Sequence, residues 1–312
     1  MNVKKLFMIS MVMCFMLCTL CAATNAGATN SSATKAGATN AGATNSDATN
    51  AGAVTGSGDY FALSWLADSI ILGSSVSLDI TDIILDKVVK LNRTPWSGEQ
   101  LDVTSVNAFD KSMMFSYNKT FDLASDVLAV SAMLFPAVLF ASPMEEWFTI
   151  GIMYAESLTW AFGIKELLKL TVARTRPYMY FENYPEDDVL EGKWNLSFPS
   201  GHTTYAFTGA AFSTYVFCRY FPTSLWRYAV GFGSYVLAAT TATFRITSGS
   251  HFATDVLAGA SIGTICGFIV PFIHSLLASD SQKPGTKKGE IEVAENYSLR
   301  LSPFGIDFTI SM

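Results

Sequence analysis

The chain has 312 residues, of which half are hydrophobic and only 15% are charged. Its mean hydropathy of +0.31 favours a membrane protein over a large soluble protein with an apolar helical core. The formal net charge of -6 argues against nucleic acid as a partner, because phosphate backbones bind basic surfaces.

The first 58 residues are expected to precede the folded domain. Residues 1–23 have the features of a secretory signal peptide, with Lys4 and Lys5 before an apolar run and Cys21 at the start of a small-residue cleavage site. An uncleaved anchor is the alternative, whereas Leu20 disfavours lipid modification of Cys21. Residues 24–58 repeat Ala-Gly-Ala-Thr-Asn and have too few apolar side chains to offset the entropy of ordering, which predicts a flexible linker.

A membrane-embedded domain is expected over residues 59–279. Its first segment, Phe61 to Leu91, is apolar but contains four aspartates (Asp68, Asp79, Asp82 and Asp86). Because carboxylates are costly inside a bilayer, we expect two amphipathic helices on the membrane surface, broken near Gly73 to Ser77. A polar connection over residues 92–121 follows.

Five apolar runs come next, at about 122–141, 147–168, 203–221, 225–243 and 253–278. The last is long enough to cross a hydrocarbon core of about 30 Å, and its stripe of Gly259, Ala260, Gly263 and Gly267 suits close helix packing. Pro136 in the first run is tolerable in a membrane helix. The expected fold is therefore all-α, a helical bundle with about five transmembrane helices plus the N-terminal amphipathic helices.

The remaining cysteines and the tail carry less information. Cys218 and Cys266 lie in apolar runs, so we expect buried thiols with neither a disulfide nor a metal site. The tail, residues 280–312, alternates apolar and polar residues from Ile291 onward, which predicts short strands. Two such strands need further pairing, with a partner or a second copy.

The first of three polar clusters ends the second apolar run. Lys169 and Arg176 are seven residues apart, which places them on one face of a helix, and Pro177 is expected to end that helix just after Arg176. Arg174 falls off this face and is expected to be a bystander. Cations at a helix end are also common as interfacial anchors.

The second cluster, Pro199-Ser200-Gly201-His202, precedes an apolar run. The free N–H groups and the positive dipole at a helix start favour an anion, and Gly201 lets the backbone approach an oxygen closely. An ordinary capping turn is the alternative interpretation.

The third cluster runs from Arg245 to Asp255. If a helix starts at Gly249 or Ser250, His251 and Asp255 lie one turn apart on the same face. A carboxylate there can orient the imidazole and leave its other nitrogen free to attack phosphorus, with Arg245 holding the anion. The third histidine, His274, lies in an apolar run without a charged neighbour, and we expect a packed or interfacial residue.

The three clusters together carry a resemblance. Lys-x6-Arg-Pro, Pro-Ser-Gly-His and Arg-x5-His-x3-Asp, in this order over about residues 147–265, resemble the three-part signature of the type-2 phosphatidic acid phosphatase superfamily. One departure is Phe244, where the family usually has serine before the arginine. This departure bears on the support of Arg245 or on substrate preference.

The resemblance implies a phosphatase that hydrolyses a lipid phosphate or diphosphate monoester through a phosphohistidine. His251 would attack phosphorus, Asp255 would hold its ring, and His202 would protonate the leaving oxygen and then activate water. The residues expected to bind the phosphoryl oxygens are Lys169, Arg176, Ser200, Gly201 and Arg245. We expect neither a metal nor another cofactor, since three cations already supply the positive charge.

The expected location depends on topology. With an exported N-terminus, and with residues 61–91 lying on the surface, the site faces the periplasm or exterior of a cell membrane. A single spanning helix over 61–91 would place it in the cytoplasm. The alternatives are a soluble exported acid phosphatase, a vanadium haloperoxidase, and a membrane protein with a dead site.

Overall fold

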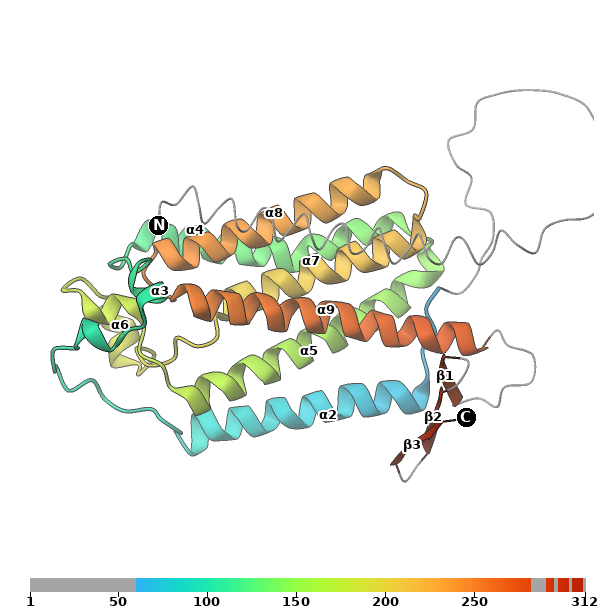
Figure 1. The fold of residues 1–312 in the computed structure, drawn as a ribbon, viewed down its shortest axis with the longest axis horizontal. Coiled ribbons are helices and arrows are strands. Elements are labelled where there is room, and N and C mark those ends of the chain that lie inside the picture. Colours follow the sequence, from blue (N-terminus) through green and yellow to red (C-terminus); the bar gives the residue numbers. More distant parts are fainter. Residues whose placement is uncertain (1–59, 282–289, 295–296, 303–304, 311–312) are drawn as a thin grey trace, which may run out of the picture.

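The computed structural model describes residues 60–281 and the strand residues 290–294, 297–302 and 305–310, so the expected signal (1–23) and linker (24–58) lie outside the described residues. Long helices lie side by side in a bundle (Figure 1), and the expected all-helical bundle is confirmed. They are α2 (Trp65–Ile83), α4 (Lys119–Leu134), α5 (Trp147–Val172), α7 (Gly201–Tyr220), α8 (Trp226–Thr247) and α9 (Ala253–Ser281).

Short elements fill the connections. They are a π-helical turn (Ile84–Val88), α3 (Ala108–Lys111), α6 (Glu186–Leu190) and 3₁₀ turns at Val103–Ser105, Phe135–Ala141, Met144–Glu146 and Pro177–Tyr180. In the tail, β1 (Glu290–Ala294), β2 (Tyr297–Ser302) and β3 (Gly305–Ile310) form an antiparallel sheet in that order. The tail strands thus pair with one another. The sequence had suggested pairing with a partner or a second copy.

Helix α7 is the centre of the bundle, and α4, α5, α8 and α9 all pack against it. Its contact with α9 depends on glycine. A Cβ at Gly259, Gly263 or Gly267 would lie 2.5, 2.1 or 2.4 Å from a carbonyl oxygen of α7, closer than real side chains approach. The small-residue stripe predicted from the sequence therefore does form a backbone-to-backbone helix contact.

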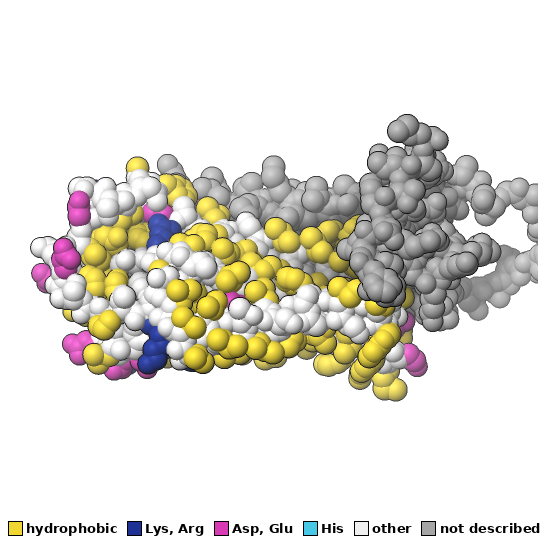
Figure 2. Space-filling model, turned by 90° about the horizontal axis from the view of Figure 1, so that it is seen from below, with side chains coloured by type: hydrophobic (Ala, Val, Ile, Leu, Met, Phe, Trp, Pro, Cys, Tyr) yellow, Lys and Arg dark blue, Asp and Glu magenta, His cyan; other side chains and the backbone are white. Residues whose placement is uncertain are grey.

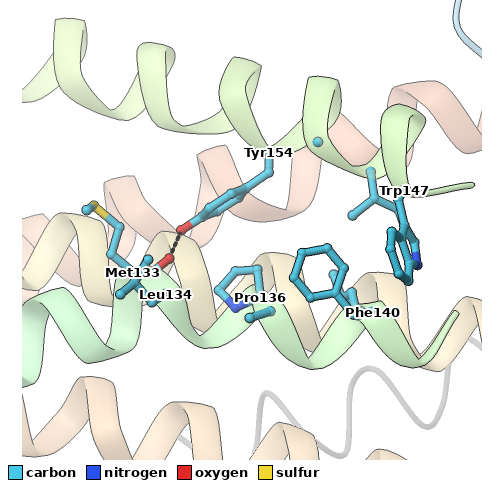
Figure 3. A pocket seen from close by; sticks show the side chains of 10 residues that line it. Met133, Leu134, Pro136, Phe140, Trp147 and Tyr154 are labelled. Atoms are coloured by element: carbon cyan, nitrogen blue, oxygen red, sulfur yellow. Dashed lines mark hydrogen bonds between the residues drawn. The ribbon is translucent and has the colours of Figure 1, made fainter. Parts of the chain in front are cut away.

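Pro136 ends the regular part of α4, and the chain continues as a 3₁₀ turn to Ala141. Proline has no N–H to donate to the preceding turn, which leaves backbone carbonyls there without helical partners. Tyr154 of α5 donates its hydroxyl to the carbonyl of Met133 at 2.6 Å, beside an apolar pocket that Phe140 and Trp147 also line (Figure 3). Helix packing thus compensates for the proline, as membrane helices require.

The expectation of two surface helices broken near Gly73 to Ser77 is wrong. Helix α2 is continuous through these residues and packs along α5, as Figure 1 shows. Ser74 and Ser75 donate their hydroxyls to carbonyls of the preceding turn, so these polar side chains are hydrogen-bonded within the helix and do not interrupt it. Trp160 of α5 donates to the carbonyl of Ile71 at 3.1 Å, which fastens α2 to the bundle.

The carboxylates did not make α2 a surface helix because the three that lie within it do not point outward. Asp82 is buried, and Asp68 and Asp79 are half-buried against the bundle. Asp86 lies beyond α2, in the π-helical turn, where it pairs with Arg93. The outward face instead exposes apolar side chains (Ile70, Val76, Ile80 and Ile83). Charged groups that face a bundle interior avoid most of the cost that the sequence argument assigned to them.

Two segments of the described chain, Lys119–Ala141 and Ala253–Ser279, are long and apolar enough to cross a membrane by length and composition. Apolar side chains also cover much of the flank of the bundle that Figure 2 shows, while most of the acidic side chains in this view gather at one end. That end carries the connections α2–α4, α5–α7 and α8–α9 (Figure 1).

Candidate active site

The three polar clusters meet at the end of the bundle that carries α3 and α6 (Figure 1). Lys169 comes from the last turn of α5, Arg176 from the loop after it, and Arg245 from the last turn of α8. His202 lies in the first turn of α7. The charges of all four act on His251, so the structure brings the predicted residues together.

His251 lies in the loop between α8 and α9 and is 2% exposed. Its Nδ1 is 2.7 Å from the backbone oxygen of Ser197, and a carbonyl only accepts, so Nδ1 carries the proton and Nε2 has the lone pair. Burial, and then the positive charges of Arg176 and Arg245, lower the pKa of His251 well below its ordinary value. The ring is therefore neutral at physiological pH, as a nucleophile must be.

Asp255 does not hold the ring directly. Its Oδ2 is 3.9 Å from His251 Nδ1, too far for a hydrogen bond. The expected helix from Gly249 or Ser250 is also wrong: Gly249 has φ +75° and α9 begins only at Ala253. Asp255 Oδ2 instead accepts from the Ser197 hydroxyl at 2.6 Å and from the Phe252 N–H at 2.8 Å. Asp255 thus positions Ser197, and Ser197 positions the imidazole.

Arg174 is not the bystander that its place in the sequence suggested. One arm of its guanidinium, Nη1, donates to Asp255 Oδ1 at 2.5 Å, and the other, Nη2, donates to Asp110 Oδ2 at 2.7 Å. Its guanidinium carbon lies 4.1 Å from the ring centroid of Phe252. A planar, forked cation is the side chain suited to bridge two carboxylates while stacking on a ring.

Asp110, on α3, completes this network. It is fully buried and accepts from the N–H of Thr254 at 2.9 Å and from its hydroxyl at 2.6 Å. Burial alone would raise the pKa of Asp110, but the hydrogen bonds from Thr254 and Arg174 outweigh it and lower the pKa. The carboxylate therefore stays ionised and anchors the start of α9.

Lys169 and Arg176 do not share a helix face, because α5 ends at Val172 and Ala173 adopts the left-handed conformation. Arg176 is extended, as expected for a residue before proline. It is fixed by a 3.0 Å hydrogen bond from its Nε to the carbonyl of Lys193. The two cations reach the site by different routes, one along a helix and one across a loop.

The start of α7 lies directly beside Lys169. A Cβ on Gly201 would lie 3.2 Å from Lys169 Nζ, so glycine leaves room for the ammonium group against the first turn. Ser200 is buried, its N–H donates to the Asp255 carbonyl, and its hydroxyl pairs with that of Thr203. Amides in a helix's first turn lack helical partners, which leaves the Gly201 N–H able to meet an anion.

Arg245 is held by α4. Its Nη1 donates to Asp122 Oδ1 at 2.6 Å and to the Ser125 hydroxyl at 3.0 Å, while its buried Nε has no hydrogen-bond partner. The unusual Phe244 packs on Phe121, with ring centroids 5.4 Å apart. Support for the arginine thus comes from a helix outside the three motifs.

His202 also has a partner on α4. Its Nε2 is 3.0 Å from Asp126 Oδ1, and both side chains are partly exposed. The sequence analysis missed Asp122 and Asp126, although carboxylates four residues apart in an apolar run are a usable signal for function. It also missed Ser197, whose contribution to His251 is a backbone oxygen and leaves no trace in the sequence.

The chemistry of these residues favours an anion over a metal. The ionisable groups around His251 include three cations, while the nearby carboxylates Asp110, Asp122 and Asp255 already bind arginine. Among the described residues, the group that could ligate a metal is Asp68, Glu156 and His274, which lies elsewhere in the bundle. A helical bundle with a neutral buried histidine, a second histidine paired with a carboxylate and three cations defines a phosphoryl-binding class of protein.

Comparison with known sequences identifies the family within that class. Residues 150–277 match the PAP2 superfamily, the group of type-2 phosphatidic acid phosphatases. The resemblance predicted from the three motifs is confirmed.

Relatives share parts of the chain. Over 84 residues the chain is 37% identical to a lipid A 1-phosphatase of Porphyromonas gingivalis, covering 27% of this chain and 18% of that protein. Over 143 residues it is 25% identical to a PA-phosphatase related-family protein of Dictyostelium discoideum, covering 43% of this chain and 52% of the relative. The chain thus spans at most about half the length of these two relatives.

A solved structure is also similar. The transmembrane PAP2-type phosphatidylglycerolphosphate phosphatase from Bacillus subtilis superposes with a TM-score of 0.40 at 17% identity, covering 70% of this chain and 98% of that one.

Proposed function

We propose that this protein is a phosphatase that hydrolyses a lipid phosphate or diphosphate monoester through a phosphohistidine. The observation that carries the proposal is the state of His251. Its Nδ1–H is held by the Ser197 carbonyl, which directs an unprotonated Nε2 into a region where three cations act on it. A neutral nucleophile among fixed positive charges suits attack on a phosphate anion.

In the first step, Nε2 of His251 forms a bond to phosphorus while the bond from phosphorus to the ester oxygen breaks. His202 donates a proton to the departing oxygen. Burial lowers the pKa of His202, and Asp126, 3.0 Å from its Nε2, opposes this by stabilising the protonated ring. The phosphoryl oxygens are bound by Lys169, Arg176, Ser200, Gly201 and Arg245.

In the second step, His202, now neutral, takes a proton from water. The resulting hydroxide attacks phosphorus and the bond to His251 Nε2 breaks, which releases inorganic phosphate and restores both histidines. Arg245 is suited to follow the phosphoryl group through both steps, since its Nε is buried and unpaired while Asp122 and Ser125 fix Nη1. Chemistry of this kind requires no metal, because the cations of the site supply the neutralisation.

Two features support a lipid as the substrate. The site lies at the end of a bundle with an apolar flank and two segments able to cross a membrane. The relative with the higher identity bears the name lipid A 1-phosphatase. A membrane location makes lipid esters the accessible substrates, whereas a soluble acid phosphatase would take small esters.

The test is phosphate release by the purified full-length protein from a panel of esters. The panel contains phosphatidic acid, phosphatidylglycerol phosphate, an isoprenyl diphosphate, a phosphorylated lipid A and an aryl phosphate, each assayed with and without EDTA. We expect EDTA-resistant release from a lipid ester that His251→Ala abolishes. Arg227→Ala changes a half-buried arginine in the first turn of α8, at the other end of the bundle. It serves as the matched control and retains full activity.

Other outcomes would replace the proposal. Release from the aryl phosphate alone by a protein that is soluble without detergent would favour an exported acid phosphatase. Vanadate-dependent halide oxidation without ester hydrolysis would favour a haloperoxidase. An absence of release from every ester would favour a membrane protein with a dead site.

The orientation proposed from the sequence, with the site on the outer side, now depends on α2. Its 19 residues span about 28 Å, and residue 60 lies at the end of the bundle opposite the site (Figure 1). If α2 crosses the bilayer, an outward site requires residue 60 on the cytoplasmic side. An N-terminus exported by a signal in residues 1–23 would instead turn the site inward.

Cysteine labelling distinguishes the two orientations. In a background without native cysteines, Asp187→Cys lies at the site end and Thr223→Cys at the opposite end, both at exposed positions. With an outward site, an impermeant maleimide labels the first variant in intact cells and the second only after permeabilisation. The reverse pattern would place the site in the cytoplasm.

A further inference from the structure

A second group of ionisable side chains lies inside the bundle, away from the candidate active site. Asp68 comes from the first turn of α2, Glu156 from α5 and His274 from the last third of α9. Glu156 and His274 are fully buried. Thirteen residues of α5 separate Glu156 from Lys169, about 20 Å along the helix. The sequence predicted a packed or interfacial histidine here, but the structure gives His274 two carboxylate neighbours.

The hydrogen bonds of His274 define its tautomer. Its Nδ1 lies 2.9 Å from the backbone oxygen of Ala62, and the Ala62 N–H donates to the His274 carbonyl at 3.1 Å. Because that oxygen only accepts, Nδ1 carries a proton. The other ring nitrogen, Nε2, is 2.8 Å from Glu156 Oε2, so it faces a carboxylate in the bundle interior.

The group has more acceptors than donors. Glu156 Oε1 and Asp68 Oδ1 are both buried without a hydrogen-bond partner. The charged groups that act on His274 are Glu156 and Asp68 themselves. The 2.8 Å contact between Nε2 and Glu156 Oε2 requires a shared proton, which leaves the group with a net charge of −1. Buried charge requires a compensating cation, and a divalent ion that replaces this proton would balance both ionised carboxylates.

We propose that Asp68, Glu156 and His274 form a binding site for a divalent transition-metal ion, with Zn²⁺ or Mn²⁺ as the fitting class. One oxygen from each carboxylate and a ring nitrogen lie within 4.8 Å of one another. A doubly charged ion balances the two carboxylates. The imidazole ligand favours Zn²⁺ over Mg²⁺ and Ca²⁺, while the two carboxylates also suit Mn²⁺. The ion links α2, α5 and α9, and it takes no part in the chemistry at His251.

Binding requires a local rearrangement of both carboxylates, and Asp68, whose Oδ1 lies 3.8 Å from Nδ1, has to move towards Nε2. Ligand atoms around a tetrahedral zinc ion lie roughly 3.3 Å apart, given metal–ligand distances of about 2.0–2.1 Å. The Nε2–Oε2 separation of 2.8 Å therefore opens by about half an ångström when the ion replaces the shared proton. The Ala62 carbonyl keeps Nδ1 protonated and so presents Nε2 as the ligand.

The test measures metal content in the full-length protein, purified in detergent and stripped with a chelator. The protein is incubated with Zn²⁺ or, separately, with Mn²⁺, then desalted and analysed by mass spectrometry. We expect close to one ion per chain and a higher midpoint of thermal unfolding with the ion than without it. Mn²⁺ is included because thiolates such as those of Cys14, Cys18 and Cys21 bind it weakly.

Three variants make the measurement specific. Glu156→Gln and His274→Gln keep the side-chain size and should lose both the retained ion and the shift in unfolding midpoint. His202→Gln removes a histidine at the other end of the bundle and should retain both. Because the measured quantities are metal content and unfolding, the result is independent of phosphatase activity.

Two outcomes would overturn the proposal. If the wild-type protein retains no metal, the group is neutralised by protons alone. If Glu156→Gln and His274→Gln retain as much metal as the wild type, the bound metal is an adventitious ion only.

Discussion

Replacing Arg174 tests how the structure positions His251, the proposed nucleophile. Its guanidinium bridges two fully buried carboxylates, Asp110 and Asp255, at 2.7 and 2.5 Å. Arg174→Ala removes the shared cation and leaves both acids unpaired. Breaking a buried ion pair from one side costs about 3–5 kcal/mol. Because the Arg174 side chain is itself 23% exposed, we take the lower end, about 3 kcal/mol.

This loss is measurable as thermal unfolding in detergent. For a folded region of this size, about 1 kcal/mol corresponds to a shift of about 2–4 °C, so Arg174→Ala should unfold about 6–12 °C below the wild type. The unfolding midpoint of Arg174→Lys should fall between those of Arg174→Ala and the wild type, because lysine keeps the positive charge but cannot donate to two carboxylates from a forked guanidinium. Arg227→Ala, the control at the other end, removes an arginine that donates to the Pro222 carbonyl and the Tyr228 hydroxyl and bridges no pair of buried carboxylates. It should lower the unfolding midpoint far less than Arg174→Ala.

Activity separates a positioning function from a purely structural one. Assayed well below the unfolding temperature, Arg174→Ala should lower kcat by roughly 10²-fold with a smaller change in KM, because Asp255 no longer fixes Ser197 and the His251 ring shifts. If Arg174→Ala unfolds within 2 °C of the wild type and keeps kcat within about threefold, the network does not hold the nucleophile and the argument fails.

Three further predictions use other parts of the structure. Asp126→Asn should lower kcat by about 10²-fold on an alkyl phosphate ester but far less on an aryl phosphate, because a good leaving group needs little help from His202; equal losses on both would contradict this. Gly263→Ala should reduce the free energy of unfolding by about 1–3 kcal/mol in chemical denaturation, since its Cβ would meet an α7 carbonyl at 2.1 Å. The control Gly73→Ala, which faces open space, should be neutral or stabilising by up to about 1 kcal/mol. Because the pKa of His251 lies below its ordinary value of 6.5 and the neutral ring attacks, the decline of kcat/KM on the acid side of its pH profile should be centred below 6.5; an acid-side decline centred at 6.5 or above would contradict a neutral, buried His251.

The sequence named side chains that the structure brings together around His251, because residue type and local spacing carry their chemistry. A glycine at a helix start indicates close approach of an anion, and a histidine six residues after an arginine indicates a nucleophile near a cation. Both predictions depend only on the local sequence. The glycine stripe of α9 also predicted a close helix contact, because Gly259, Gly263 and Gly267 leave a groove that another backbone can enter.

The sequence failed where a residue's role depends on which way it points. The aspartates of α2 (Asp68, Asp79 and Asp82) contributed to the prediction of a surface helix, because composition counts charges but does not say which face they occupy. In the bundle they face inward and α2 packs along α5. For the same reason His274 was expected to be a packed residue, since its carboxylate neighbours lie 118 and 206 positions earlier in the chain.

The sequence by itself predicted the helical class, the resemblance to the family and the candidate residues for attacking or binding phosphate. Only the tertiary structure decided how those residues are held. Asp110, Asp122, Asp126 and Arg174 are ordinary charged residues until folding places them beside Asp255, Arg245 and His202. The physical reason is that a buried charge must be paired, and the partner is set by helix packing across the bundle. A sequence motif can predict a nucleophile, whereas the residues that position the nucleophile are determined by the fold.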